Sequence, residues 1–204
     1  MMFKNIISNH SFYGIIRHCR DVFFSRLILG RKVKLVKLPF YIYGAKHIAF
    51  GKRFVAGTNL RIEVLALLPA QKPSVVIGDY TKFNDNIHIG CITKISIGSN
   101  TLLGSHILIE DHNHGVYKGE GDHESPCIPP EERRYSYDGI EIGDNVWIGD
   151  HVCVLSGAKI GNGAVVGAMS LVNSVVPPYT MVVGVPARVI KKFNFDNKRW
   201  EKVC

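Results

Sequence analysis

The chain has 204 residues, of which 46% are hydrophobic, and carries a formal net charge of +8. This length suits one domain with a good-sized core and terminal elaborations. The charge lies at the ends, because residues 1–53 contain eleven Lys and Arg against one acidic residue, Asp21, and the segment from Arg188 is basic again. Basic ends indicate an anionic partner, such as a phosphorylated cofactor or a membrane surface, or else solvated charge. No binding module or basic-aromatic pattern accompanies them, so we expect no nucleic-acid partner.

Five cysteines are scattered without C-x-x-C spacing. This pattern favours a reduced, cytoplasmic protein, with the inner face of the membrane as a further location for a basic chain. No run approaches the roughly 18 apolar residues of a membrane span, and no small-residue cleavage site follows the N-terminal apolar clusters.

Residues 6–29 are expected to form one or two amphipathic helices that end near Gly30. With the basic segment that follows, residues 1–45 would cap the open end of a strand-built coil. Peripheral contact with a membrane surface through the same helix is the alternative.

A six-residue repeat dominates the rest of the chain. Aliphatic residues recur without a break in its second half: Ile142, Ile148, Val154, Ile160, Val166 and Val172. Six residues suit one short strand and one corner, and three such units close one triangular coil. The repeat begins weakly near Phe50, breaks over residues 64–74 and resumes at Ile77. We therefore predict an all-β, parallel β-helix domain over residues 46–190, followed by a basic tail, 191–204.

Strand alternation predicts that the residue two before each repeat position also points inward. These positions hold small or aliphatic residues: Thr81, Ile87, Thr101, Ile107, Val146, Val152, Ala158, Ala164 and Ser170. Glycines should occupy corners that need positive φ or close backbone approach: Gly78, Gly90, Gly98, Gly104, Gly143, Gly149, Gly161 and Gly167.

Residues 113–139 carry several Gly and Pro and no repeat, so they should leave the coil as a loop. Such an insertion is either disordered or a lid or wall of an acceptor site. The repeat itself does not give the hand of the coil, and the general crossover rule would predict a right-handed one.

The run "IGDNVWIGDHVCVLSGAKIGNGAVVGAMSLVNSVVPPYTMVVGVPARVIKKF" resembles the C-terminal half of hexapeptide-repeat sugar O-acetyltransferases of the galactoside and maltose group. The resemblance covers residues 77–193, whereas the basic front and long loop are closer to variants that act on polysaccharide or lipopolysaccharide building blocks. It implies a left-handed β-helix, a homotrimer with active sites between subunits, and acetyl-CoA as donor.

By this resemblance, the general base is His112 in "IEDHNHG". Acyl transfer to a hydroxyl needs a base, and His suits that role. The repeat phase places His112 outward, three residues after Ile109, and either Asp111 or a backbone carbonyl would orient its ring. His114 is the rival base or an acceptor-binding residue, and an H-x-H pair can also hold a metal, although we expect none. His88, His106 and His151 are expected to be solvated or to lie at a subunit interface.

The resemblance also assigns binding residues. The backbone N–H of Asp150 would bind the developing oxyanion, and Asn84 would bind the acceptor sugar. The acceptor-site carboxylate of the simple galactoside enzymes falls near Cys91 and Ile92 here and is therefore absent, which indicates a different sugar or a larger glycan.

For coenzyme A, the matching positions lie in the last third of the chain: Ala168, Asn173, Ser174, Arg188 and Lys191. The expected function is transfer of an acetyl group from acetyl-CoA to a saccharide hydroxyl, in surface polysaccharide or lipopolysaccharide assembly. A zinc enzyme like the γ-carbonic anhydrases and a non-catalytic trimer are the alternatives.

Overall fold

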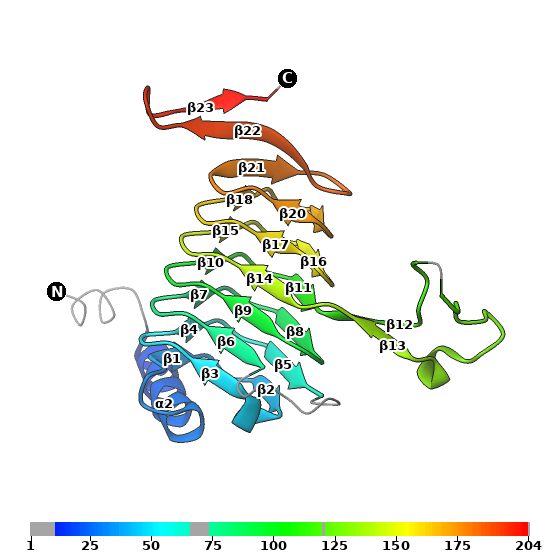
Figure 1. The fold of residues 1–204 in the computed structure, drawn as a ribbon. Helices are drawn as coiled ribbons and strands as arrows, with labels where there is room; N and C mark the ends of the chain where they lie inside the picture. Colours follow the sequence, from blue (N-terminus) through cyan, green and yellow to red (C-terminus); the bar gives the residue numbers. More distant parts are fainter. Residues whose placement is uncertain (1–10, 66–73, 120, 204) are drawn as a thin grey trace.

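The computed structural model describes residues 11–65, 74–119 and 121–203. Its centre is a rising coil of short strands that supplies three sheets, so each turn of the coil adds one strand to each sheet (Figure 1). One helix lies at the N-terminal end of the coil, and a hairpin projects from its side. The predicted class, mostly β with parallel sheets, is confirmed.

The first sheet contains β1 (Leu35–Val36), β4 (Val55–Ala56), β7 (Lys82–Phe83), β10 (Leu102–Leu103), β15 (Trp147–Ile148), β18 (Val165–Val166), β21 (Thr180–Val183), β22 (Arg188–Asn194) and β23 (Arg199–Lys202). The second contains β2 (Phe40–Tyr43), β5 (Leu60–Val64), β8 (Ile87–Cys91), β11 (Ile107–Glu110), β16 (Cys153–Leu155) and β19 (Leu171–Val172). The third contains β3 (Ile48–Phe50), β6 (Val75–Ile77), β9 (Ile95–Ile97), β14 (Ile140–Ile142), β17 (Lys159–Ile160) and β20 (Val175–Val176). The described residues also contain two short 3₁₀ helices, η1 (Ala45–His47) and η2 (Pro130–Glu132).

The coil begins earlier than the repeat predicts. β1 pairs in parallel with β4, and β2 pairs in parallel with β5, so residues 35–43 belong to the coil and not to the cap assigned to residues 1–45. At the other end, β22 and β23 add an antiparallel ladder to the first sheet. The segment 191–204 is therefore largely strand in its described part, where a tail is expected.

The repeat positions form the core. All six aliphatic residues from Ile142 to Val172 are buried, and so are the nine inward positions two residues before a repeat position. The buried side chains of Ala158, Ala164 and Ser170 occupy little volume, which matches the narrow interior of a three-sided coil. The alternation predicted from the sequence is confirmed.

The corner glycines allow the backbones of successive turns to approach closely, and they do not adopt positive φ. None of the eight glycines of the repeat has positive φ; in the described residues, Asn, His and Tyr residues such as Asn100 and His106 take the left-handed conformation at corners. A Cβ on Gly98 would lie 2.5 Å from the backbone of Gly143 in the next turn. Gly90 is a further exception, because it lies inside β8 and not at a corner.

The N-terminal cap is one described helix, α2 (Phe12–Leu29); residues 6–10 of the expected helical region lie outside the described residues. Ser11 caps its start by accepting the Gly14 N–H at 3.2 Å. The Ser25 hydroxyl accepts the Val36 N–H at 2.7 Å and donates to the Val36 carbonyl at 2.9 Å. These two bonds satisfy the outer edge of β1, so the helix covers that edge of the first sheet.

The excursion leaves the coil between β11 and β14, as the sequence predicts (Figure 1). It contains an antiparallel hairpin, which the sequence does not predict: β12 (His112–His114) pairs with β13 (Tyr135–Tyr137). The Asp138 N–H donates to the Asp111 carbonyl at 3.0 Å and closes the base of the hairpin. The excursion therefore starts and ends at one corner of the coil.

Replacing Gly98 with Ala tests the close-approach role. We expect Gly98→Ala to lower the free energy of unfolding by about 1–3 kcal/mol, because the new Cβ would collide with backbone that cannot rotate away. Gly121→Ala is the matched control, since no atom lies within 4 Å of the position of its Cβ. Denaturant titrations at equal protein concentration measure both; equal stability of the two variants would contradict the close-approach role.

Candidate active site

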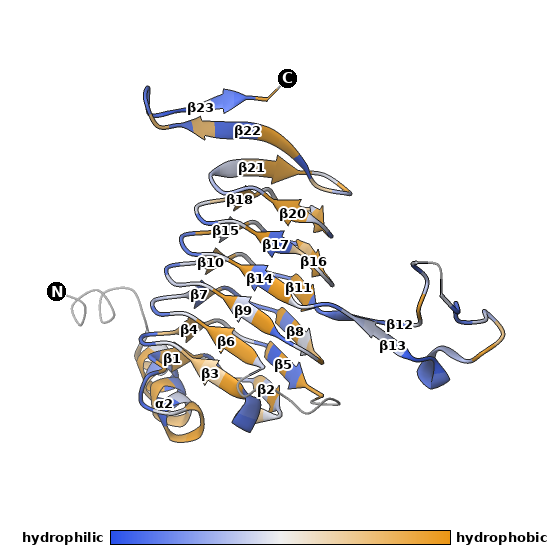
Figure 2. Ribbon diagram, in the orientation of Figure 1, coloured by the Kyte–Doolittle hydropathy of each residue, from blue (hydrophilic) through white to orange (hydrophobic). Residues whose placement is uncertain are grey.

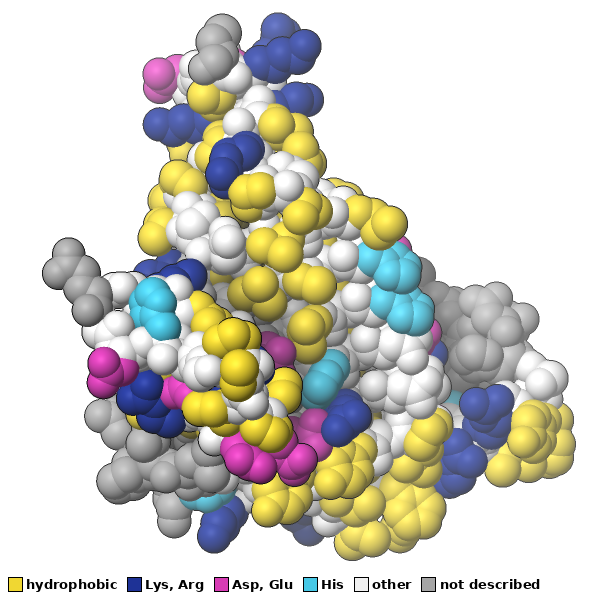
Figure 3. All heavy atoms as spheres, turned by 90° about the vertical axis from the view of Figure 1, so that its right-hand side faces the viewer, with side chains coloured by type: hydrophobic (Ala, Val, Ile, Leu, Met, Phe, Trp, Pro, Cys, Tyr) yellow, Lys and Arg dark blue, Asp and Glu magenta, His cyan; other side chains and the backbone are white. Residues whose placement is uncertain are grey.

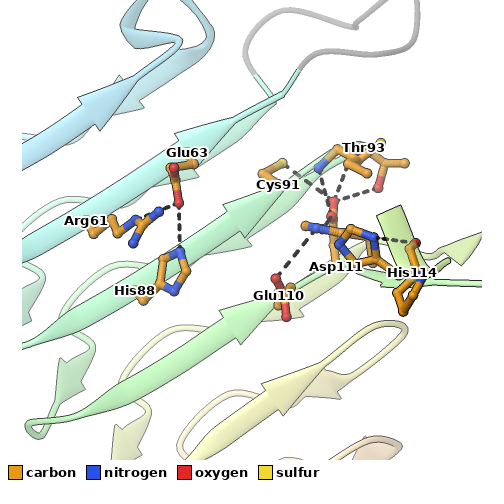
Figure 4. A network of polar contacts seen from close by, with 11 residues as sticks. Arg61, Glu63, His88, Cys91, Thr93, Glu110, Asp111 and His114 are labelled. Atoms are coloured by element: carbon orange, nitrogen blue, oxygen red, sulfur yellow. Dashed lines mark hydrogen bonds and ion pairs between the residues drawn. The ribbon is translucent and has the colours of Figure 1, made fainter. Parts of the chain in front are cut away.

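The buried carboxylate of Asp111 organises the corner from which the hairpin leaves. It is the first residue after β11, it is 0% exposed, and it faces the turn that follows β8. Its two oxygens accept the backbone N–H groups of residues 92, 93 and 94 at 2.8, 2.8 and 3.1 Å, and the Thr93 hydroxyl at 2.9 Å (Figure 4). A carboxylate is the acceptor that four converging donors require.

The charge state of Asp111 follows from these contacts. Burial alone would raise the pKa of its carboxyl, but the hydrogen bonds from His112, Ile92 and Thr93 outweigh burial and hold the pKa below its usual value. The neighbouring Cys91 is affected in the opposite direction: burial, together with the nearby Asp111 charge, raises the pKa of its thiol. Asp111 is thus the anion of this corner, and Cys91 is a neutral neighbour whose sulfur lies 3.5 Å from Asp111 Oδ2.

His112 lies between two carboxylates. Its Nδ1 is 3.3 Å from Asp111 Oδ1, and its Nε2 is 3.5 Å from Glu110 Oε1. The ring packs edge-on against Tyr135, with 5.5 Å between ring centroids. Its side chain is only 7% exposed, although the repeat phase places it outward, because β13 of the hairpin covers it.

Space for this arrangement comes from Gly90. A Cβ at this position would lie 3.3 Å from His112 Cε1 and 3.2 Å from Glu110 Oε1. Gly90 pairs with Glu110 in the ladder between β8 and β11. The ring and the Glu110 side chain therefore lie over the one residue of this strand pair that has no side chain.

His114, the rival residue, has a looser environment. It is exposed at the other end of β12, its Nδ1 lies 3.3 Å from the Pro130 carbonyl oxygen, and its ring centroid is 6.3 Å from that of His112. Its contact with Tyr135 is a ring contact, with 4.7 Å between centroids. No carboxylate orients it among the described residues, so His112 is the better placed of the two to act as a base.

Asn84 and Asp150 lie at the opposite end of the second sheet. Both are exposed at the corner that precedes β8, β11 and β16, and they lie two turns apart, with the Gly104–Ser105 level between them. At this corner a side chain of one turn accepts a backbone N–H of the turn before it: Asp85 Oδ1 accepts Thr58 N–H and Asp150 Oδ1 accepts Ser105 N–H, both at 2.6 Å.

Among the described residues the Asp85 N–H meets no such acceptor, and at the level after Asp150 the residue is Ala168. The methyl group of Ala168 cannot accept a hydrogen bond, and Ala168 stands one turn beyond Asp150 at this corner. Within the described part of the chain, the Asp150 N–H meets no acceptor. An exposed N–H at this corner can bind an external oxygen.

One chain does not bring His112 and this N–H together. Glu110 pairs with Leu155 in the ladder between β11 and β16, so the His112 corner lies level with the end of β16, while Asp150 precedes its beginning. At about 3.3 Å per residue, the length of the sheet separates the two by roughly 15 Å or more. The same separation holds between His112 and Asn84, which precedes β8.

The residues expected to bind coenzyme A cluster at the C-terminal end of the coil. Ala168, Asn173 and Ser174 are exposed there. The Ala187 N–H donates to the Leu171 carbonyl at 2.8 Å, which ties the start of β22 to this edge.

A β-bulge aligns the two basic residues of β22. Arg188 pairs with Val183 and Lys191 pairs with Met181, with the register shift between them. Val183 and Met181 share one face of β21, so the bulge puts Arg188 and Lys191 on one face as well. An unbulged strand would place two residues three apart on opposite faces.

The structure also places side chains that the sequence does not single out. Glu110 and Thr93 lie at the His112 corner. The alternation of β11 predicts that Glu110 points outward, but only the hairpin geometry places it beside the imidazole ring of His112. The other histidines lie elsewhere: His88 contacts Glu63 at 3.0 Å, and the His106 and His151 rings stack at 4.7 Å. Among the described residues, no group of three or more His, Cys, Asp or Glu is arranged to hold a metal.

The Asp111 contacts make a testable prediction about stability. Asp111→Asn would turn an amide N–H₂ toward N–H donors, so we expect a loss of about 2–4 kcal/mol in unfolding free energy at pH 7. Because the folded-state pKa of Asp111 lies below its unfolded value of about 3.9, its contribution is present above that value and is lost as pH falls through the folded pKa.

Denaturant titrations from pH 7 downward measure this difference, which should shrink below about pH 4. Asp144→Asn is the control, because the exposed Asp144 accepts one N–H, that of Ser99. A loss equal to that of the control would show that the cluster is not stabilising.

Comparisons with known proteins fit this fold. A family model described as "Bacterial transferase hexapeptide (six repeats)" matches residues 139–183. Among solved structures, a maltose O-acetyltransferase from Clostridium difficile 630 is 28% identical with a TM-score of 0.58, over 72% of this chain and 71% of that one. The N-acyltransferase AntD from Bacillus cereus, solved with dTDP and coenzyme A, has a TM-score of 0.65 at 23% identity, over 81% of this chain and 82% of that one. The likeness to AntD is one of fold.

Two Escherichia coli K12 proteins are similar in sequence. The galactoside O-acetyltransferase is 31% identical over 81% of this chain and 64% of its own length. WbbJ, named as a lipopolysaccharide biosynthesis O-acetyl transferase, is 38% identical over 98% of this chain and 100% of its own length. With an identity of this size over both whole chains, and with buried hexapeptide repeats throughout the coil, this chain belongs to the hexapeptide-repeat O-acetyltransferase family.

Proposed function

We propose that the protein transfers the acetyl group of acetyl-CoA to a hydroxyl of a saccharide, with His112 as general base. The observation that carries this proposal is the Asp111–His112 pair: a buried anion lies at Nδ1 of the imidazole, 3.3 Å away. A carboxylate there favours the tautomer that has its proton on Nδ1. Nε2 then has a free lone pair for the proton of the acceptor hydroxyl.

The reaction proceeds by direct attack in a ternary complex. Nε2 of His112 removes the hydroxyl proton while the oxygen attacks the thioester carbonyl. The tetrahedral intermediate collapses, the C–S bond breaks, and the imidazolium returns the proton to the leaving thiolate. The products are the acetyl ester and free coenzyme A, and the enzyme ends in its starting protonation state.

The oxyanion of this intermediate would bind the N–H of Asp150, which Ala168 at the next level leaves without an acceptor among the described residues. His112 and Asp150 of one chain lie at opposite ends of the second sheet, so the two groups can meet only when a second copy supplies one of them. We assign a homotrimer with sites between neighbouring subunits and, from the family, a left-handed coil.

Exposed apolar side chains along the coil support this assembly. Trp147 of the first sheet, Met169 at the corner between β18 and β19, and Val175 of the third sheet are 54%, 69% and 67% exposed in one chain. Hydrophobic side chains also gather along the coil on the face drawn in Figure 3. Large exposed apolar patches are typical of surfaces that another molecule covers.

The donor would lie along the C-terminal end of the coil. Exposed backbone near Ala168, with Asn173 and Ser174, suits the polar pantetheine arm, and Arg188 and Lys191 on one face of β22 suit phosphates. Asn84 from the corner before β8 would bind the acceptor. The names of the relatives support a saccharide of surface polysaccharide or lipopolysaccharide assembly as this acceptor.

A thiol-release assay with acetyl-CoA and a panel of methyl pyranosides, nucleotide sugars and lipid-linked glycans tests the function. We expect His112→Ala to lower kcat by at least about a hundredfold, with coenzyme A binding retained in calorimetry. His114→Ala tests the rival assignment and should lower kcat far less than His112→Ala. Full activity of His112→Ala would contradict the base assignment, while absence of transfer to any acceptor, with zinc in the purified protein, would favour the carbonic anhydrase-like alternative.

The helix α2 supports a second partner, an anionic membrane surface. Its buried residues are polar, Asp21 and Ser25, whereas its exposed face carries large apolar side chains. Four of these form one stripe by helical spacing: Phe12, Ile16, Phe23 and Leu27, which are 79%, 51%, 62% and 67% exposed.

Charge favours a bilayer as the occupant of this face. Arg17 and Arg26 flank the apolar stripe, and the helix has no exposed acidic residue, because its one carboxylate, Asp21, is buried and paired with Arg20 at 2.7 Å. Figure 2 shows the helix as mainly hydrophobic. No helix among the described residues is long and apolar enough to cross a membrane. We therefore assign α2 to the interface plane, with apolar residues among the acyl chains and arginines at anionic headgroups.

Vesicle sedimentation with the full chain tests this contact. We expect binding to an equal mixture of phosphatidylcholine and phosphatidylglycerol, weaker binding to phosphatidylcholine alone, and a loss of about tenfold or more in partitioning for Phe23→Ser combined with Leu27→Ser. Phe195→Ser at the other end of the coil is the control, since Phe195 is 61% exposed. Unchanged vesicle binding of the double variant would contradict the contact. A double variant that changes its oligomeric state but still binds vesicles as the wild type does would also contradict it.

A further inference from the structure

Glu110 lies beside the reactive nitrogen, and the proposed mechanism does not use it. It ends β11, and its side chain is 33% exposed, with Oε1 3.5 Å from His112 Nε2 (Figure 4). The space that it shares with the ring is open because Gly90, its ladder partner, has no side chain. The carboxylate therefore faces the place where an acceptor hydroxyl must approach.

In the tautomer that the reaction needs, His112 Nε2 and the Glu110 carboxylate both require hydrogen-bond donors. With the ring proton on Nδ1 toward Asp111, Nε2 is an acceptor, and the Glu110 carboxylate beside it is also an acceptor. Two acceptors 3.5 Å apart cannot satisfy each other. The attacking hydroxyl supplies one donor, to Nε2, so a second donor is needed within reach of Glu110.

A second hydroxyl on the adjacent ring carbon meets this demand. The oxygens of neighbouring gauche hydroxyls on a pyranose lie within hydrogen-bonding distance of each other, so one hydroxyl can donate to His112 Nε2 while the next donates to Glu110. An acceptor with a single hydroxyl would leave the carboxylate without a partner once the site is closed to water, at a cost in binding. An acceptor with its own carboxylate or phosphate at this position would meet like charge.

We propose that Glu110 binds the hydroxyl next to the one that is acetylated, and so selects a neutral sugar with a vicinal diol. This inference rests on the proposed acetyl transfer. It also identifies which strand supplies a carboxylate to the acceptor site: β8 has Gly90 and Cys91 at the end of its run, and the neighbouring β11 supplies Glu110 instead.

The test compares two acceptors in two enzymes. The methyl pyranoside that the wild-type enzyme acetylates best is paired with its analogue that lacks the hydroxyl next to the acetylated one. We expect Glu110→Ala to lower kcat/KM for the diol by about tenfold or more, mainly through KM, and to leave the deoxy analogue nearly unchanged. Glu110→Gln, which keeps one acceptor oxygen, should recover part of the loss. Glu141→Ala is the control, because Glu141 is an exposed residue of the third sheet.

A matched methyl pyranoside that is phosphorylated on the hydroxyl next to the acetylated one tests the charge. Wild type should disfavour it, and Glu110→Gln should raise its rate relative to the neutral sugar. An equal loss for the diol and the deoxy analogue would mean that Glu110 only orients His112, and the proposal would be wrong while acetyl transfer stood. Absence of transfer by the wild type to every pyranoside and glycan tested would overturn the proposed function, and the role of Glu110 with it.

Discussion

The hydrogen bonds to Asp111 hold together the corner that carries the proposed base, His112. Four donors from residues 92–94 fix the carboxylate at the corner after β8, and the same group faces Nδ1 of His112. A buried charge is tolerated only when it is paired and hydrogen-bonded, so the corner, the base of the hairpin and the orientation of the imidazole form one unit. A substitution that disturbs one of these three features should therefore alter the structure of the other two.

The coil fixes the distance between this unit and the corner that holds Asp150. The strands of the second sheet pair in parallel from one turn to the next, so the sheet holds the corner with His112 and the corner with Asp150 apart. In the proposed mechanism, one corner supplies the base and the other supplies the oxyanion donor. Sites shared between copies would then link catalysis to assembly, and a variant that separates the subunits should lose activity without any change at His112.

Much of the fold could be predicted from the sequence because a six-residue period has few structural solutions. The inward positions follow from alternation, and the exit of the excursion follows from the loss of the period. The start of the coil could not be predicted, because residues 35–43 form strands without the glycines and repeat spacing that mark later turns. Short strands there are fixed by pairing with β4 and β5.

The site could be predicted in part. The family resemblance assigns His112 as the candidate base, but the burial of His112 depends on Tyr135, which lies far along the chain and reaches it through the hairpin. The common face of Arg188 and Lys191 depends on a bulge that spacing alone argues against. The place of Glu110 beside Nε2 depends on the absence of a side chain at Gly90 on another strand. These features need three-dimensional contacts between residues distant in sequence.

The tautomer of His112 is the measurement that tests the Asp111–His112 pairing most directly. Long-range ¹H–¹⁵N spectra of the full chain with ¹⁵N-labelled histidine, assigned by comparison with His112→Gln, distinguish a protonated from an unprotonated ring nitrogen. The pairing predicts a proton on Nδ1 and a free lone pair on Nε2 in the neutral ring at the pH of the assay. A neutral ring with its proton on Nε2 would contradict it, because that nitrogen could not then accept the proton of the acceptor hydroxyl.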